Sequence, residues 1–200
     1  MANVNAPFGL RPVRHLNGSP WNGQTIRCYL HASYAVAMFV GDPVQYQTEL
    51  NYKDTTGKHP SIMLCAGSTT TTVFGVITSF EPDPDNLSLQ YNPASNERYA
   101  NVCLAGDVIF QIQDDGAGAP TAVFVGQNTT MTAGSRTGTI DGLSAYVLDS
   151  TTPTTTQAHP LHILRVSDIE DNTLGDNCIY DVIISTPSDA TGRWLGVTAT

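Results

Sequence analysis

The sequence predicts an all-β protein whose body is an antiparallel β-barrel or β-sandwich. Short apolar runs of strand length recur about every 8–12 residues, with Gly, Pro, Asn and Asp between them. No window of about 11 residues sustains a helical period. The composition is rich in Thr, Ser, Asn and Gly and only 14% charged. Because roughly 25% charge is usual, this balance favours strands and turns over helices.

The clearest pair of strands lies within residues 161–185. Its second run alternates, so one face carries Cys178, Tyr180, Val182 and Ile184. Its first run, residues 161–166, is apolar on both faces, which indicates a strand covered on two sides. Asn and Gly residues between the runs tolerate left-handed backbone. We therefore expect a hairpin-like pair at the centre of a sheet, with an acidic loop at its tip.

Other strands are expected along the chain. Residues 26–31 alternate with an apolar face, and residues 44–52 give the longest period-2 pattern, with Val, Tyr, Thr, Leu and Tyr on one face. Residues 87–91 also alternate, residues 102–104 and 108–113 form two strands joined at 105–107, and residues 122–125 form a short strand.

The first 25 residues predict an extended N-terminal arm, followed by a single β-rich body over residues 26–200. Three prolines and three glycines oppose regular structure in residues 1–25. Apolar residues such as Phe8 and Trp21 make the same segment unlike a disordered tail. We expect the arm to dock on a neighbouring subunit or, alternatively, on its own acidic body. At the other end, Trp194 and Leu195 are candidate anchors of the C-terminal segment.

Charge is distributed unevenly. Arg11, Arg14 and Arg27 are the charged residues before Asp42, whereas the net charge of the whole chain is −9. A basic arm on an acidic body fits an acidic neighbouring protein surface. It argues against nucleic-acid binding by the body, because phosphates would be repelled.

The four cysteines lie in separate apolar runs without a CxxC pattern, which predicts buried free thiols in a reducing cytoplasm and no zinc site. The N-terminus lacks the apolar core of a signal peptide, and no run approaches the roughly 20 residues of a membrane span. We expect synthesis in the cytoplasm and no membrane partner.

No motif predicts an enzyme, a metal site or a cofactor. His159 and His162 are separated by a proline that breaks helical spacing, and the acidic segments 83–86 and 168–172 lack the calcium-loop pattern. The sequence GSRTG at 134–138 places its serine one position too early for a nucleophile elbow.

Five segments carry a family resemblance: NAPFGLRPVRHLNGSPWNGQT at 5–25, GDPV at 41–44, FGVITSFEPDPDNLSLQYNPAS at 74–95, DVIFQIQDD at 107–115 and LHILRVSDIEDNTLGDN at 161–177. Together they resemble small tailed-bacteriophage structural proteins of the capsid decoration, or cement, type. The resemblance implies a virion protein on the capsid surface, with the major capsid protein as partner and a homotrimer as the assembly.

If this role holds, the arm supplies the contacts, because aromatic residues and Arg are enriched at interface cores. Phe8, Arg11, Arg14 and Trp21 are then the expected partner-binding residues. A head- or tail-fibre-like module that binds host glycans is the alternative, since Tyr, Trp and Asn/Asp loops can serve that role. An envelope hydrolase is a third reading.

Overall fold

A computed structural model describes residues 3–68, 72–133, 142–155 and 158–185. Over these residues the chain is all-β, and each strand pairing is antiparallel. The prediction of an antiparallel all-β body is therefore confirmed. Residues 134–138 and Trp194, which were singled out in the sequence, lie outside the described residues.

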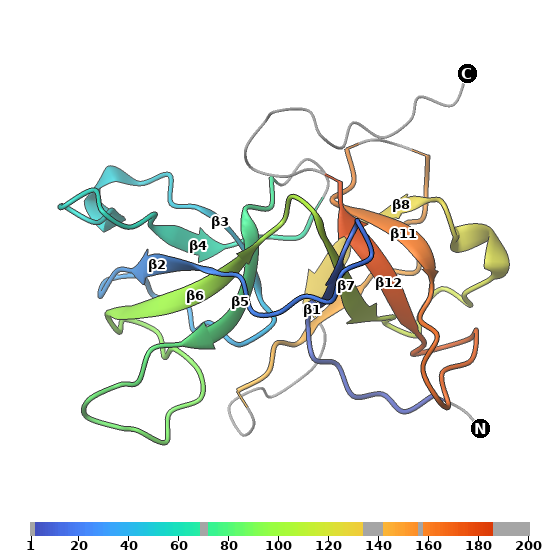
Figure 1. Ribbon diagram of the computed structural model, residues 1–200, viewed down its shortest axis with the longest axis horizontal. Helices are drawn as coiled ribbons and strands as arrows, with labels where there is room; N and C mark the ends of the chain where they lie inside the picture. Colours follow the sequence, from blue (N-terminus) through green and yellow to red (C-terminus); the bar gives the residue numbers. More distant parts are fainter. Residues whose placement is uncertain (1–2, 69–71, 134–141, 156–157, 186–200) are drawn as a thin grey trace.

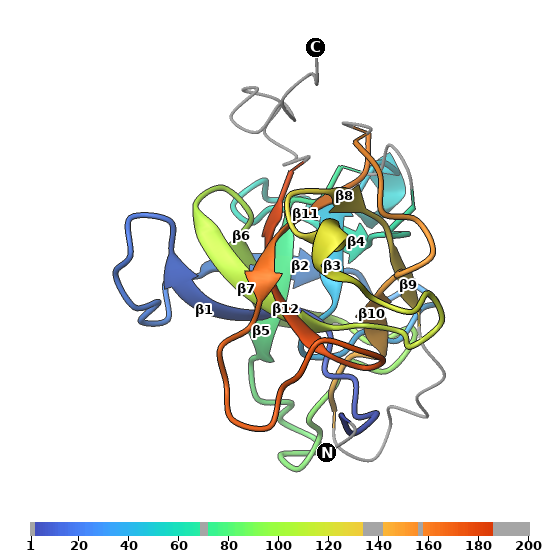
Figure 2. The same ribbon diagram turned by 90° about the vertical axis from the view of Figure 1, so that its right-hand side faces the viewer.

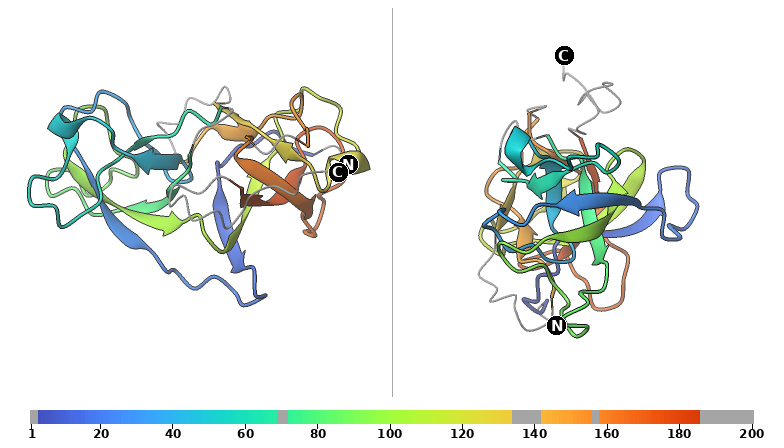
Figure 3. Two further views of the ribbon diagram at one scale, coloured as in Figure 1. Left: turned by 90° about the horizontal axis from the view of Figure 1, so that it is seen from above. Right: turned by 90° about the vertical axis from the view of Figure 1, so that its left-hand side faces the viewer.

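Two five-stranded sheets lie side by side along the longest axis of the molecule (Figure 1, Figure 3). In spatial order the first sheet contains β1 (Arg11–His15), β7 (Val108–Gln113), β12 (Ile179–Ile184), β11 (Leu161–Val166) and β8 (Asn128–Thr129). The second contains β2 (Ile26–Leu30), β6 (Arg98–Leu104), β5 (Gly75–Phe80), β3 (Pro43–Tyr46) and β4 (Ile62–Leu64).

A smaller sheet pairs β9 (Met131–Ala133) with β10 (Tyr146–Leu148). β10 lies against β7, and Leu148 at its end forms a bridge with Asp114, which follows β7. Met131, Tyr146 and Leu148 are buried in the same apolar core as Phe110 and Tyr180. The small sheet therefore covers the inner face of the first sheet.

In the described part of the chain, buried apolar side chains form two cores, and the first also includes Val76 of β5 and Cys103 of β6 from the second sheet. The first core is built on β7, β11 and β12, and all four residues predicted to share a face of the last strand, Cys178, Tyr180, Val182 and Ile184, are fully buried there. The second core is built on β2, β5 and β6. Leu64 packs against both cores and so connects them.

The predicted central pair is confirmed. β11 and β12 pair antiparallel, with Ile163 opposite Val182, and β12 has a neighbour on each side in the sheet. The loop between them contains Asp171 and Asn177 with positive φ angles of 61° and 59°. These conformations are tolerated by Asp and Asn because their short polar side chains bond locally.

Three strand predictions are wrong. The pattern over residues 44–52 gives a strand only to Tyr46, followed by a 3-10 helix at Leu50–Tyr52, and Leu50 is 80% exposed. The strand ends because its partner β4 begins at Ile62, opposite Tyr46. Residues 122–124 form a 3-10 helix, and residues 87–91 form a loop.

Candidate functional site

The N-terminal segment, residues 3–15, is held against the rest of its own chain. Asn3 Nδ2 donates to the carbonyl oxygens of Thr173 and Asp176 at 2.9 Å each. Leu10 is 1% exposed within the first core, and its N–H donates to Gly41 O at 2.9 Å. With β1 paired to β7, residues 3–15 are part of the body. The contacts of residues 3–15 follow the alternative that the sequence left open, docking on the chain's own body. An arm over residues 1–25 that reaches a neighbouring subunit stays a prediction.

Close packing fixes the course of this segment. Gly9 has a φ of +73°, and a Cβ there would overlap Ser144 Cβ and lie 2.5 Å from Gly41 O. Gly41 has a φ of +95°, and a Cβ there would overlap Phe8 O, much closer than any van der Waals contact. Two glycines are therefore needed where the N-terminal segment crosses the loop before β3.

Gln113 ties the preceding residues to the sheet. Its Oε1 accepts from Ala6 N at 2.9 Å, and its Nε2 donates to Val4 O at 2.8 Å and to Asn177 O at 3.0 Å. One side-chain amide thus joins the N-terminal segment, β7 and the β11–β12 loop. The backbone groups of Val4 and Ala6 are thus hydrogen-bonded although these residues do not form a strand.

A polar row crosses four strands of the first sheet. Arg11, Gln111, Asp181 and Arg165 are neighbours in register on β1, β7, β12 and β11. Arg11 Nη2 donates to Gln111 Oε1 at 2.6 Å, Gln111 Nε2 lies 3.3 Å from Asp181 Oδ1, and Arg165 Nε donates to Asp181 Oδ2 at 2.7 Å. Since Asp181 is 1% exposed, the row compensates its buried carboxylate and orients the Arg11 guanidinium.

These contacts build an exposed surface, which we call the N-terminal face. It consists of Val4, Phe8, Arg11 and Ile169, which line one cavity, and of the exposed Leu174 in the same loop as Ile169. The Arg11 guanidinium lies over the Phe8 ring, 4.8 Å from its centroid. Val4, Ile169 and Leu174 are 77%, 40% and 44% exposed. A cavity of about 280 Å³ opens between the N-terminal segment and the β11–β12 loop, and its lining includes Phe8, Arg11 and Ile169.

Four exposed acids lie in the β11–β12 loop at the edge of the N-terminal face, and two of them line the cavity: Asp168, Glu170, Asp171 and Asp176, of which Glu170 and Asp171 are the lining residues. An apolar surface with one stacked Arg and a charged rim is the usual composition of a protein–protein contact. The face therefore combines two of the four predicted partner-binding residues, Phe8 and Arg11.

The other two predicted residues lie elsewhere. Arg14 is exposed on β1, where it forms a bridge with Pro20 across a loop that projects from the body (Figure 2, Figure 3). Trp21 is half-buried and packs against the first core. The structure thus separates Arg14 and Trp21 from the N-terminal face.

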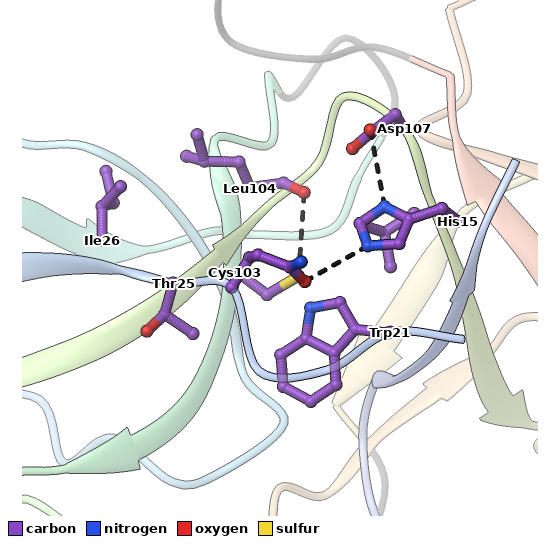
Figure 4. Close-up of a pocket in the computed structure, with 9 residues that line it drawn as sticks. His15, Trp21, Thr25, Ile26, Cys103, Leu104 and Asp107 are labelled. Carbon is purple, nitrogen blue, oxygen red and sulfur yellow. Dashed lines mark hydrogen bonds and ion pairs between the residues drawn. The ribbon is translucent and has the colours of Figure 1, made fainter. Parts of the chain in front are cut away.

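Trp21 lines a second cavity of about 380 Å³, which we call the Trp21 pocket (Figure 4). It lies where β1 and β7 of the first sheet meet β2 and β6 of the second, and its lining includes Ile26, Leu104, Val108 and Asp107. His15 Nδ1 lies 3.4 Å from Asp107 Oδ2, and His15 Nε2 lies 3.2 Å from Gln24 Oε1. The indole Nε1 of Trp21 is buried with no hydrogen-bond acceptor among the described residues and points toward Cys103 (Figure 4).

The chemistry of this pocket favours binding over reaction. Burial raises the pKa of the Cys103 thiol to about 12, so it stays protonated near neutral pH and is a poor nucleophile. The prediction of buried, unpaired cysteines is confirmed for all four.

Away from this pocket, burial lowers the pKa values of His159 and His162.

The residues that the structure describes contain no group of three or more His, Cys, Asp or Glu side chains placed to hold a metal ion. They also contain no helix with the length and apolar character needed to cross a membrane.

Sequence reasoning missed the residues that organise the N-terminal face. Gln111 and Gln113 alternate with the buried Phe110 and Ile112 along β7, so the strand pattern alone could have placed both amides on the outer face. Their partners, Arg11 and residues 4–6, are about 100 positions away in the sequence. No local pattern reports such a contact.

The fold and these surfaces define an all-β protein whose described residues include one exposed, partly apolar face and one pocket with apolar walls. Comparisons with models of protein families, with curated proteins and with solved structures found no match.

Proposed function

We propose that this protein is a structural component of a tailed-bacteriophage virion, a decoration protein that binds the outer surface of the major capsid protein lattice and stabilises the head. The sequence resemblance supplies the class, and the N-terminal face supplies the contact. The observation that carries the proposal is the exposure of Val4, Ile169 and Leu174 beside the stacked pair Phe8 and Arg11. Apolar residues gathered at one place on a surface mark interaction sites.

The face is suited to association because it is already ordered. Asn3 exchanges hydrogen bonds with Thr173, whose N–H donates to Asn3 Oδ1 at 3.1 Å. Arg11 is oriented by Gln111 and by the Phe8 ring. Because side chains and loops that are ordered before binding lose less entropy, such a face binds more tightly for the same area.

Arg14, on β1 at the base of the projecting loop, provides a second contact in this proposal. Its guanidinium fits an acidic shell surface, whereas the acids beside the N-terminal face fit basic positions of the same shell. A homotrimer on the capsid remains part of the proposal.

Sedimentation with purified capsids lacking this protein tests the proposal. We expect Val4→Asp and Leu174→Asp each to weaken binding by at least about tenfold, as for a residue near the centre of an interface. Leu87→Asp is the matched control, because Leu87 is 80% exposed in the β5–β6 loop, in the other half of the molecule (Figure 1). Arg14→Ala is expected to reduce binding less, with a stronger effect at low salt.

Wild-type binding by both face variants, with folding verified by circular dichroism, would contradict this proposal. Binding to a glycan array without affinity for capsids would instead support the glycan-binding alternative.

A further inference from the structure

The outer face of the second sheet carries a series of aromatic rings in contact, which we call the aromatic row. It consists of five half-buried side chains, in the order Tyr52, His31, Tyr29, Tyr99 and His59. The centroids of successive rings are 5.3, 6.1, 5.6 and 5.1 Å apart. β2 and β6, which carry the middle of the row, lie at the opposite end of the molecule from the β11–β12 loop and so from the N-terminal face (Figure 1).

Strand pairing fixes the two central rings of the row. Tyr29 of β2 is directly opposite Tyr99 of β6. In its strand Tyr29 stands between Cys28 and Leu30, which are 0% and 1% exposed in the second core. Because side chains alternate across a strand, the Tyr29 ring points away from that core. The row is therefore built on a rigid sheet rather than on loops alone.

Arg27 adds fixed polar groups to one end of the row. Its guanidinium lies over the Tyr99 ring, 3.7 Å from the centroid, and donates to both carboxylate oxygens of Glu81 at 2.5 and 2.7 Å. Its Nη1 lies 3.2 Å from His59 Nε2. A guanidinium held on both sides in this way keeps one orientation, so donors and acceptors stand at set positions beside the rings.

A cavity of about 340 Å³ opens beside Arg27 and Tyr99. This volume is within the roughly 300–1,000 Å³ of small-molecule sites. Its lining includes four carboxylates and one side-chain amide, those of Glu81, Asp83, Asp85, Glu97 and Asn96. Carboxylate and amide oxygens accept hydrogen bonds from hydroxyl groups. Since only the guanidinium groups of Arg27 and Arg98 oppose the four carboxylates, the lining repels phosphates and other anions.

We propose that the aromatic row and this cavity form a binding site for a neutral saccharide. A pyranose ring has a face of C–H groups and a rim of hydroxyl groups. The C–H face packs on the exposed ring surface of the row, because aromatic faces carry the negative part of the ring quadrupole. The hydroxyl groups donate to the carboxylates of the cavity, and a chain of sugars extends along the row. The site goes beyond the proposed function, because a protein bound to a capsid through the N-terminal face keeps the row free.

Saturation-transfer NMR tests the site in the full-length protein. The probes are the methyl glycosides of glucose, galactose, mannose and N-acetylglucosamine, none of which is charged. We expect transfer from the protein to the ring C–H protons of at least one of them, as for a sugar whose C–H face lies on aromatic rings. Absence of transfer to all four would overturn the proposal, and binding of a tetralysine peptide in their place would assign the surface to a basic protein segment.

A ring substitution assigns the binding to the row. We expect Tyr99→Ala to weaken saccharide binding by about tenfold, as for the loss of an aromatic anchor. Tyr46→Ala is the matched control, because Tyr46 is 46% exposed on β3 of the same sheet and its ring packs against Phe74. If circular dichroism shows that Tyr99→Ala does not fold, Asp85→Ala replaces it, because Asp85 is exposed in the β5–β6 loop and lines the cavity. Wild-type affinity in the folded variant refutes the site.

Capsid sedimentation separates this site from the proposed function. Tyr99→Ala should bind capsids as the wild type does, and Val4→Asp should keep the saccharide affinity of the wild type. Failure of one proposal thus leaves the other intact. Loss of capsid binding in folded Tyr99→Ala would show that the row contacts the shell, and it would refute a saccharide site that stays free on the capsid.

Discussion

Asp42 is buried at the crossing of the N-terminal segment and the loop before β3, and it gives a stability prediction whose magnitude follows from the structure. The residue is 3% exposed, and its Oδ2 accepts from Phe39 N at 2.7 Å. Burial raises its pKa to about 6 from 3.8, although hydrogen bonds from Ser144 and Phe39 oppose the shift. Asp42→Asn keeps an acceptor for Phe39 and removes the charge.

The sign follows from proton binding. Between the unfolded and folded pKa values, the folded state holds a proton that the unfolded state has lost, so stability falls as pH rises. A shift of about two units corresponds to about 3 kcal/mol. We therefore expect the free energy of unfolding of wild type, relative to Asp42→Asn, to fall by about 2 kcal/mol between about pH 4 and about pH 7, because part of the total is already lost at pH 4.

Urea unfolding of both proteins at the two pH values measures this difference. Asp168→Asn is the matched control, because Asp168 is exposed in the β11–β12 loop and should leave the pH dependence as in wild type. A wild-type-minus-variant difference that does not change with pH would refute the reasoning, since it would mean that Asp42 has the same pKa in both states.

Three further outcomes are expected. Gly9→Ala should lower the free energy of unfolding in urea by about 3 kcal/mol or more, because it combines a left-handed backbone with overpacking. Gly23→Ala should lower it by only about 1 kcal/mol, since Gly23 has a φ of +93° but nothing within 4 Å of the added Cβ. Equal losses would contradict close packing where the N-terminal segment crosses the loop before β3. Tyr146→Phe removes the buried bond from Tyr146 Oη to Cys65 O at 2.6 Å and should lower the melting temperature by about 2–6 °C in calorimetry, whereas an unchanged value would show that the bond contributes nothing net. Cys28 and Cys103 have pKa values raised to about 12 by burial, so Ellman's reagent should label them only as the protein unfolds; rapid labelling of the native protein would show that the cores open.

Whether an alternating pattern in the sequence forms a strand depends on which strands lie beside it in the sheet. Residues 178–184 were placed correctly because the alternation there coincides with a partner on each side of β12. The alternation at 44–52 is as regular, but the strand ends at Tyr46, where β4 provides no further partner. Periodicity reports which face a strand would bury, and only pairing decides whether the strand forms.

The candidate contact residues were predicted in part. Phe8 and Arg11 lie together on an exposed face, as an interface requires. Trp21 is packed against its own core, because the chain turns back after β1 and its N–H donates to Val13 O. A local sequence pattern gives the chemistry of each side chain. It does not say whether that side chain packs within its own chain or remains exposed for a partner.

The sequence by itself determined the all-β class, the central pair β11–β12 and the burial of the cysteines, because these follow from side-chain periodicity and turn chemistry over short ranges. The tertiary structure decided that β6 and β7, consecutive in the chain, belong to different sheets, and that the first residues complete one of them. It also decided that Asn3 meets Thr173 and that Arg11 meets Gln111. These contacts depend on strand order, which is set by the joint burial of apolar faces far apart in the sequence.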